Sequence, residues 1–507
     1  MAHIAREHLP IPDRKHVGLT TYDAKDPDTS YPPITTLRPP AGAPNVLIVL
    51  IDDLRFDELG ICGHPYMKTP HIDRIGHEGA RFTAAFHTTP LCSPNRASIL
   101  TGQYASRHGI IDNVARDAHS YRLPNYHVIL QRLGYETAHV GKWHMGNSGG
   151  PRPGYDRWVS FPGHGSIVDP VLNIDGRERQ HKGYITDLLN RHAVDFLKKK
   201  RRKPFALFLA HKAVHPDAFQ AADGTIDLSK GGYRAADRHK NLYKGERFPL
   251  PPSAVPSAEV VKQKPAWKEA FELRVNKASR AVLDGIGAGT QEEIRLRAAM
   301  MASVDEGMGD IFEVLEANGE LDNTFILFLG DNGYFFGEHG LGPERRFAYE
   351  EGIKSPFLVR YPAWFKPGTV NDDLVLALDI APTLVDLAGG KAADCRTMQG
   401  LSLRPLAAAA KSGKRPKGWR SSFMCEYFSE NAMPWLVGMS YKAIRTKRHK
   451  YIHWTQKSLD GIECDELYDL ERDPYEMRNQ IGKRSEQGLV GRLRKQLAAL
   501  VARSVGL

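Results

Sequence analysis

Three apolar runs, each ending in polar residues, constrain the fold of this 507-residue chain more than any other feature. NVLIVLIDD ends in Asp52 and Asp53, PFALFLAHKAVHP contains two histidines near its end, and TFILFLGDNG carries Asp331 and Asn332. A short, continuous apolar run is typical of a strand buried on both faces of a parallel sheet. Because the carboxyl ends of parallel strands line one crevice, we expect these polar residues to lie close together.

Segments with helical periodicity separate the three runs. The clearest are residues 185–199 and 292–319, and a glycine ends the second. This alternation predicts an α/β/α sandwich with a large mixed, mainly parallel sheet. After the small, basic region 390–417, short strands and a closing helix predict a smaller C-terminal α+β domain with a short antiparallel sheet.

Changes in composition suggest the domain limits. Residues 1–44 are rich in Pro, Asp and Thr and predict an extended N-terminal arm, which packs on the chain's own surface or on a neighbouring subunit of a homo-oligomer. Residues 45–400 form the predicted catalytic domain, with an insertion near the site at 218–291. Residues 401–507 form the predicted C-terminal α+β subdomain.

Composition argues against several classes of protein. No apolar stretch approaches the roughly 20 residues of a membrane span, and the N-terminus has no secretory signal, so we predict no membrane partner and a cytoplasmic location. Five scattered cysteines without a C-x-x-C pair predict neither a disulfide framework nor a zinc site. The net charge is +10, but its densest cluster, at 198–203, ends a predicted helix and complements the helix dipole. We therefore predict no nucleic-acid partner.

The acidic strand ends indicate a metal site. Asp52, Asp53, Asp331 and Asn332 supply the oxygen ligands that Ca²⁺ or Mg²⁺ prefers. Either pair alone is more simply explained by turn or helix-capping residues. Two pairs, together with the run CSPNR at 92–96, favour a single site instead.

The run CSPNR matches the C-x-P-x-R signature of the type I sulfatases. Further motifs of that family follow in its order and approximate spacing: IVLIDD, PLCSPNRASILTG, VGKWHMG, GYITDLL, HKAVHP, FLGDNG, GEHGL, YEEGIKSPFLVRYP and DELYDLERDP. The chain therefore resembles the formylglycine-dependent sulfatases over nearly its whole length after residue 44. The resemblance implies an alkaline-phosphatase-like fold and hydrolysis of a sulfate monoester to an alcohol and inorganic sulfate.

The same resemblance implies that Cys92 is a precursor. A formylglycine-generating enzyme reads the CSPNR motif and oxidises the cysteine to Cα-formylglycine, whose hydrate presents two hydroxyls. One hydroxyl attacks sulfur, and the other, deprotonated by His144, expels sulfate as the aldehyde re-forms. A serine or cysteine ester lacks that second hydroxyl and would need water to attack a hindered anion.

The resemblance also assigns the remaining site residues. One divalent metal, with Ca²⁺ preferred over Mg²⁺ or Mn²⁺, has as its ligands Asp52, Asp53, the modified Cys92, Asp331 and Asn332. In this assignment Arg96 anchors the diol, and Lys142 binds a sulfate oxygen. His144 is the base, His215 binds sulfate and acts as the acid, and Arg345 binds the anion.

Two of these positions need comment. Arg345 occupies a position that is usually lysine in the family. Because arginine keeps its proton near neutral pH, we assign Arg345 to binding and leave protonation of the leaving group to His215. His211 lies four residues before His215, and we expect it either to pack in the core or to support a residue of the site without touching the substrate.

Two other functions are weighed against the sulfatase prediction. Phosphonate monoester and phosphodiester hydrolases of the same superfamily typically carry histidine where this chain has Asn332. A catalytically silent anion-binding protein on this fold should have lost a site residue, and none is missing. The alcohol part of the substrate, whether a sugar, a phenol or a choline-like group, stays open, because the specificity loops lie in 218–291 and the C-terminal domain.

Overall fold

The computed structural model describes residues 25–26, 39–221, 226–254, 263–266, 291–341, 344–413, 416–431, 436–455 and 463–506, without the side chains of 219–220 and 226–230. Most of the predicted arm (1–44) and much of the predicted insertion (218–291) lie outside these residues. The domain limits stay predictions.

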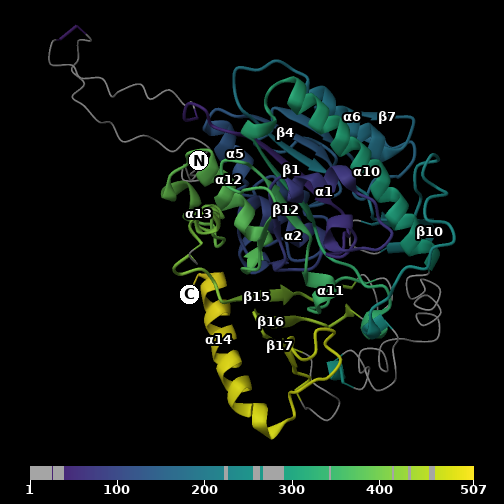
Figure 1. The fold of residues 1–507 in the computed structure, drawn as a ribbon, viewed down its shortest axis with the longest axis vertical. Coiled ribbons are helices and arrows are strands. Elements are labelled where there is room, and N and C mark those ends of the chain that lie inside the picture. The colour runs from purple at the N-terminus through teal and green to yellow at the C-terminus, as the bar shows by residue number, and fades with distance from the viewer. Residues whose placement is uncertain are drawn as a thin grey trace, which may run out of the picture.

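A large mixed sheet forms the centre of the molecule (Figure 1). The strand order within the described residues is β13-β2-β12-β11-β1-β8-β4-β5-β6-β7. β1 (Asn45–Ile51) pairs in parallel with β11 (Thr324–Gly330) on one side and with β8 (Phe205–Ala210) on the other. These central strands are the three apolar runs, and all their residues are buried, which confirms the prediction.

The parallel set continues from β8 to β4 (Glu136–Gly141) and then to β5 (Arg157–Ser160). Antiparallel pairs occur toward both edges and make the sheet mixed. The edge strands are β12 (Phe357–Arg360), β2 (Ala80–Phe82) and β13 (Thr369–Asn371) on one side, and β6 (Val171–Ile174) and β7 (Arg177–Gln180) on the other.

Helices cover both faces of the sheet, as the sequence predicts. Alternate residues of β1 point to opposite faces: Val49 belongs to one hydrophobic core and Ile48 to the other. The first core includes α1 (Pro70–His77), α6 (Ile185–Leu197) and α10 (Gln291–Ala317). The second includes α2 (Cys92–Thr101), α5 (Tyr126–Arg132), α12 (Ile380–Leu387) and α13 (Arg404–Ser412).

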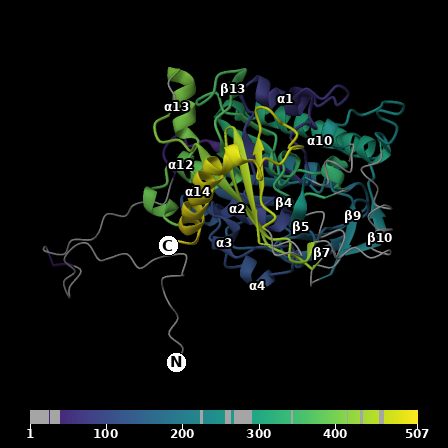
Figure 2. The same ribbon diagram turned by 90° about the horizontal axis from the view of Figure 1, so that it is seen from below.

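A second, smaller sheet follows near the C-terminus. Its antiparallel order is β15 (Ser422–Tyr427), β16 (Tyr441–Thr446), β17 (His449–Trp454) and β18 (Glu466–Asp469). The long helix α14 (Gln487–Val505) packs against it, and Figures 1 and 2 show this C-terminal unit in yellow beside the large sheet. No helix among the described residues combines the length and the apolar character that a membrane span requires.

Short elements complete the described structure. They are the strand pairs β3 (Ala85–Phe86) with β14 (Val375–Leu376) and β9 (Asp217–Gln220) with β10 (Ile226–Gly232), and the helices α3 (Ala105–His108), α4 (Asp117–Ser120) and α11 (Glu350–Ile353).

A buried ionic network joins the C-terminal sheet to the segment around α11. The Nζ atom of Lys450, on β17, lies 2.9 Å from Glu350 Oε1 and 2.6 Å from Glu476 Oε1. The Tyr349 hydroxyl donates to Glu466 Oε2 over 3.0 Å. Buried charges are costly unless they are paired, so these contacts fix the two parts against each other.

Asp305, on α10, caps α1 from outside that helix. Its Oδ1 accepts the backbone N–H of Ile72 over 2.8 Å, and Thr69, at the N-cap of α1, makes no capping bond of its own. Burial raises the pKa of Asp305 to about 6. Because the folded-state pKa lies above the value of about 4 in an unfolded chain, ionisation of Asp305 costs stability, and this cost grows as pH rises between the two values.

We expect Asp305→Asn to stabilise the protein in a pH-dependent way. The amide oxygen keeps the cap without carrying a charge, so the gain in unfolding free energy over wild type should grow by about 1–2 kcal/mol between pH 4.5 and pH 7. Urea unfolding at a series of pH values measures it. Asp310→Asn, an exposed carboxylate on the same helix, is the control. A gain of equal size at every pH would contradict the prediction.

Candidate active site

Five neighbouring strands deliver polar side chains to one end of the sheet. In sheet order these strands are β11, β1, β8, β4 and β5, all mutually parallel. The residues that follow them are Asp331 and Asn332, Asp52 and Asp53, His215, Lys142 and His144, and His164. Cys92 and Arg96 enter from α2, and Arg345 from the loop before α11. The carboxyl ends of the strands thus form the crevice that the sequence predicts.

Unusual backbone conformations aim two of these residues. Asp53 has φ 59° and His144 has φ 57°, in the left-handed region that residues other than glycine rarely adopt. Gly141, just before Lys142, has φ 121°, and a Cβ atom there would lie 1.9 Å from the carbonyl oxygen of Ala210. Only glycine therefore allows β4 to end so close to β8.

Cys92 is the first residue of α2, a helix that is buried along its whole length. Its Sγ lies 3.6 Å from Asp52 Oδ1 and 4.0 Å from Asp53 Oδ1. Burial raises the pKa of the Cys92 thiol well above its ordinary value, and the nearby carboxylates oppose ionisation as well. An unmodified thiol here stays protonated and is a poor nucleophile.

Each of the three carboxylates contacts at least one cation, and Asp52 contacts a second, because Arg96 Nη2 lies 3.7 Å from its Oδ1. Asp52 pairs with Lys142, Asp53 Oδ2 lies 2.9 Å from Arg345 Nη1, and Asp331 Oδ2 lies 2.9 Å from Arg96 Nε. Both guanidinium groups also have an N–H donor that makes no hydrogen bond within the described part of the site. Arg96 Nη2 and Arg345 Nε have no hydrogen-bond acceptor among the described residues. The site therefore offers positive donors to an incoming anion.

The carboxylates differ in how firmly they hold a proton. Burial alone would raise the pKa of Asp52, but Lys142, His215 and Arg96 outweigh it and hold that pKa well below its usual range. Burial raises the pKa of Asp53 despite Arg345. Burial, assisted by the Asp52 charge, raises the pKa of Asp331 to about 7. The cluster would be stabilised by further positive charge.

The donor set fits a divalent cation. Asp52, Asp53, Cys92 and Asp331 each offer a ligand atom, and these atoms all lie within 4.8 Å of one another. Asn332 donates its amide N–H to Asp53 Oδ1 over 2.7 Å, and its buried Oδ1 has no hydrogen-bond partner in the described part of the chain. A buried oxygen without a hydrogen-bond partner lowers the stability of the fold unless something binds it. Carboxylate and amide oxygens are the ligands that a hard divalent cation prefers.

His215 is oriented by two contacts. Its Nδ1 lies 2.7 Å from the carbonyl oxygen of Pro216, which can only accept, so Nδ1 carries the proton. Its Nε2 lies 3.7 Å from Asp53 Oδ2 and 3.4 Å from Arg345 Nη2. A proton added at Nε2 would face the Asp53 carboxylate.

The structure brings together all the residues that the sequence predicts for the site, and their roles stay predictions. Asn332 lies against Asp53, and Arg345 contacts both Asp53 and His215. His211 differs, because no described contact joins it to this cluster, and burial lowers its pKa to about 3. Packing in the core, one of the two roles expected of His211, agrees with this placement.

Sequence reasoning missed two buried residues of the site. The Nζ atom of Lys212 donates to the carbonyl of Pro216 over 2.9 Å, and burial lowers its pKa to about 8. His164 lies against Lys142, and its sequence signal is a histidine between two glycines directly after a strand, in FPGHGS. Neither pattern stands out without knowledge of which strands are neighbours.

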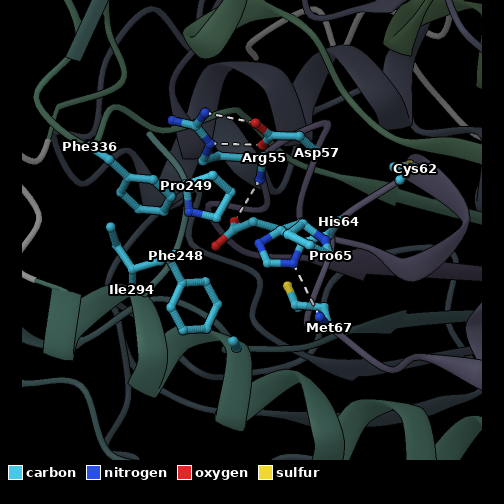
Figure 3. Close-up of a pocket in the computed structure, with 13 residues that line it drawn as sticks. Arg55, Asp57, Cys62, His64, Pro65, Met67, Phe248, Pro249, Ile294 and Phe336 are labelled. Atoms are coloured by element: carbon cyan, nitrogen blue, oxygen red, sulfur yellow. Dashed lines mark hydrogen bonds and ion pairs between the residues drawn. The ribbon is translucent and has the colours of Figure 1, made fainter. Parts of the chain in front are cut away.

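A pocket of about 200 Å³ lies beside this site, and Figure 3 shows its lining. Arg55 there is already paired with Asp57 and Glu338. The volume is smaller than the roughly 300 Å³ at which ligand pockets usually begin. The Glu58 carboxylate, also in the lining, accepts a hydrogen bond from Arg297. Arg297 also donates to the backbone carbonyl of Asp53 over 2.6 Å. The pocket wall thus supports the loop after β1.

Comparison with known families agrees with this geometry. A family model described as Sulfatase matches residues 44–390, and one described as N-sulphoglucosamine sulphohydrolase, C-terminal, matches residues 337–503. The chain is 30% identical over 494 residues to an N-acetylglucosamine-6-O-sulfatase from Bacteroides thetaiotaomicron, with 87% of this chain and 83% of the relative covered.

Solved structures show the same architecture. A protein in complex with its substrate, D-glucosamine-2-N,6-O-disulfate, has a TM-score of 0.75 and 27% identity over 91% of this chain and 98% of that chain. The phosphonate monoester hydrolase of Agrobacterium radiobacter has a TM-score of 0.70 at 21% identity, with 91% and 96% covered, and this likeness shows the fold alone.

The first family model covers well over half of the chain and includes every residue of the site. The chain therefore belongs to the sulfatase family and is a sulfuric ester hydrolase.

Proposed function

We propose that this sulfatase removes the 6-O-sulfate from a glucosamine-type sugar, using a formylglycine derived from Cys92. The observation that carries the proposal is the position of Cys92, at the start of a buried helix and 3.6 Å from Asp52, inside a cluster of paired charges. The Bacteroides relative is named for action on N-acetylglucosamine 6-sulfate, and the protein in the solved complex takes a glucosamine disulfate as its substrate. Both support the choice of sugar.

In this proposal Asp52, Asp53, Asp331 and Asn332 hold one divalent cation, with Ca²⁺ preferred over Mg²⁺ or Mn²⁺. When bound, the cation polarises a sulfate oxygen and favours the ionised form of the group at position 92. The orphaned Asn332 Oδ1 and the raised pKa of Asp331 support this assignment.

A formylglycine at position 92 supplies two hydroxyls when it is hydrated. One attacks sulfur, and the other later expels sulfate as the aldehyde re-forms. Installation of the formylglycine requires a formylglycine-generating enzyme as a partner. The position of Cys92, at the start of the buried helix α2 and 3.6 Å from Asp52 Oδ1, supports the modification.

The chain's own residues bind the anion and move the protons. Lys142 and Arg345 bind sulfate oxygens, and Arg96, through the Nη2 that has no hydrogen-bond acceptor among the described residues, anchors the group at position 92. His215 acts in its doubly protonated form: the proton added at Nε2, which faces Asp53, passes to the departing sugar oxygen as the bond between that oxygen and sulfur breaks. His144 accepts the proton of the hydroxyl that remains at position 92.

We expect N-acetylglucosamine 6-sulfate to be hydrolysed with a kcat/KM at least about 100-fold above that for galactose 6-sulfate or glucosamine 3-sulfate. A site that is complementary to one sugar leaves some of its own polar groups without hydrogen-bond partners when another sugar binds. Steady-state release of inorganic sulfate measures this. An aryl sulfate and an aryl phosphonate complete the series. A preference for the phosphonate by orders of magnitude would refute the proposal and indicate a phosphonate monoester hydrolase.

Mass spectrometry of the peptide around residue 92 tests the nucleophile. Active protein from a host with a formylglycine-generating enzyme should carry the aldehyde there, and specific activity should rise in proportion to the modified fraction. Cys92→Ala should lose activity by at least about 10³-fold, because the covalent route is gone. Full activity in protein that carries only unmodified Cys92 would exclude the formylglycine.

Substitutions of Arg345 test its assignment to binding. Arg345→Lys retains a positive charge and should keep kcat/KM within about 10-fold of wild type, whereas Arg345→Gln should lose about 10²–10³-fold. Kinetics with an aryl sulfate separate the two variants. Equal losses in both would show that the planar guanidinium itself, beyond its charge, is essential.

A further inference from the structure

His164 lies between three of the residues to which the proposed mechanism gives roles. It follows β5 in a loop whose glycines at 163 and 165 have φ 52° and φ 63°. A Cβ atom on Gly165 would lie 2.4 Å from the ring of Phe161, so this loop requires glycine there. The His164 side chain is only 4% exposed. The conformation of this loop, which depends on its glycines, therefore places His164 in a buried position within the site.

The imidazole of His164 binds Lys142. Its Nδ1 lies 3.2 Å from Lys142 Nζ, and an ammonium group can only donate, so Nδ1 is an unprotonated acceptor. The same ammonium group donates to Asp52. With two of its three hydrogens directed by these residues, the third has a defined direction.

The ring of His164 also packs against both catalytic histidines. Its centroid lies 4.0 Å from that of His144 and 4.6 Å from that of His215, and the latter pair is stacked with an interplanar angle of 24°. Burial, reinforced by the neighbouring His144 and Lys142, lowers the pKa of His164 well below its ordinary value. The neutral ring therefore keeps its acceptor for Lys142.

We propose that His164 is a positioning residue for sulfate ester hydrolysis: it fixes the Lys142 ammonium group through Nδ1 and sets the spacing of His144 and His215 through its ring. This inference rests on the proposed roles of those three residues. It extends them, because it assigns a function to a side chain outside the ten residues that the sequence predicts for the site.

Three substitutions separate the acceptor from the ring. His164→Asn can place an oxygen near the position of Nδ1, His164→Gln places one near the position of Nε2, and His164→Phe keeps a ring without an acceptor. We measure kcat and KM with 4-nitrophenyl sulfate, and the inhibition constant of inorganic sulfate, which reports how well the site holds the anion.

Loss of the acceptor should weaken anion binding. A hydrogen bond to a charged group is worth about 10- to 100-fold in an equilibrium, so His164→Phe should raise the sulfate inhibition constant by about that factor. His164→Asn should keep this constant within about 3-fold of wild type and lower mainly kcat, because it lacks the ring. His164→Gln should bind sulfate less well than His164→Asn.

The controls distinguish positioning from a general loss of structure. Thermal unfolding and the modified fraction of Cys92 are measured for every variant, and rates are expressed per modified, folded protein. His211→Asn, at a buried histidine directly after β8 that no described contact joins to the cluster, should stay within about 2-fold of wild type.

An unchanged sulfate inhibition constant in His164→Phe would overturn the inference. If that variant does not fold, equal inhibition constants for His164→Asn and His164→Gln would overturn it instead. The choice of substrate keeps this result separate from the proposed function: failure to hydrolyse N-acetylglucosamine 6-sulfate would refute the sugar assignment, whereas the His164 series is measured with an aryl sulfate and inorganic sulfate.

Discussion

Three carboxylates buried within one site impose the constraint on which the rest of this structure depends. Burial of Asp52, Asp53 and Asp331 is compatible with a stable fold only if each carboxylate is paired with a cation, since an isolated buried charge costs several kcal/mol or more of folding free energy. The pairing cations come from three separate places: a buried helix, the end of β4 and the loop before α11. Those segments must therefore be held rigidly, and much of the fold does so.

The C-terminal unit contributes to this by holding the segment that carries Arg345. Next to it, Arg346 pairs with Glu430, and the hydroxyl of Tyr441 donates to the Arg346 carbonyl over 2.9 Å. A few residues later, Lys450 pairs with Glu350. The small antiparallel sheet thus braces one side of the active site, although its own strands supply none of the ten predicted residues.

The same concentration of charge that makes the site costly also suits it to sulfate chemistry. Burial, together with repulsion from the Asp52 charge, raises the pKa values of Asp331 and Asp53, and this favours a divalent cation. The spare guanidinium donors of Arg96 and Arg345 favour an anionic substrate in turn. Preorganised charges in a water-poor site are the largest source of transition-state stabilisation in many enzymes.

The sequence by itself determined the three central strands, their alternation with helices and the acidic residues at the strand ends. Continuous apolar runs report burial on both faces, and the polar residues directly after them mark the active edge, so Asp52 and Asp331 were predictable from local pattern. The choice of His215 over His211 came from the resemblance to the sulfatases. Only the tertiary structure decided which cation meets which carboxylate, and that His164 lies between His144 and His215. The physical reason is distance along the chain: Arg345 meets Asp53 across 292 residues, and such a contact depends on strand order and register. No local pattern encodes either of these.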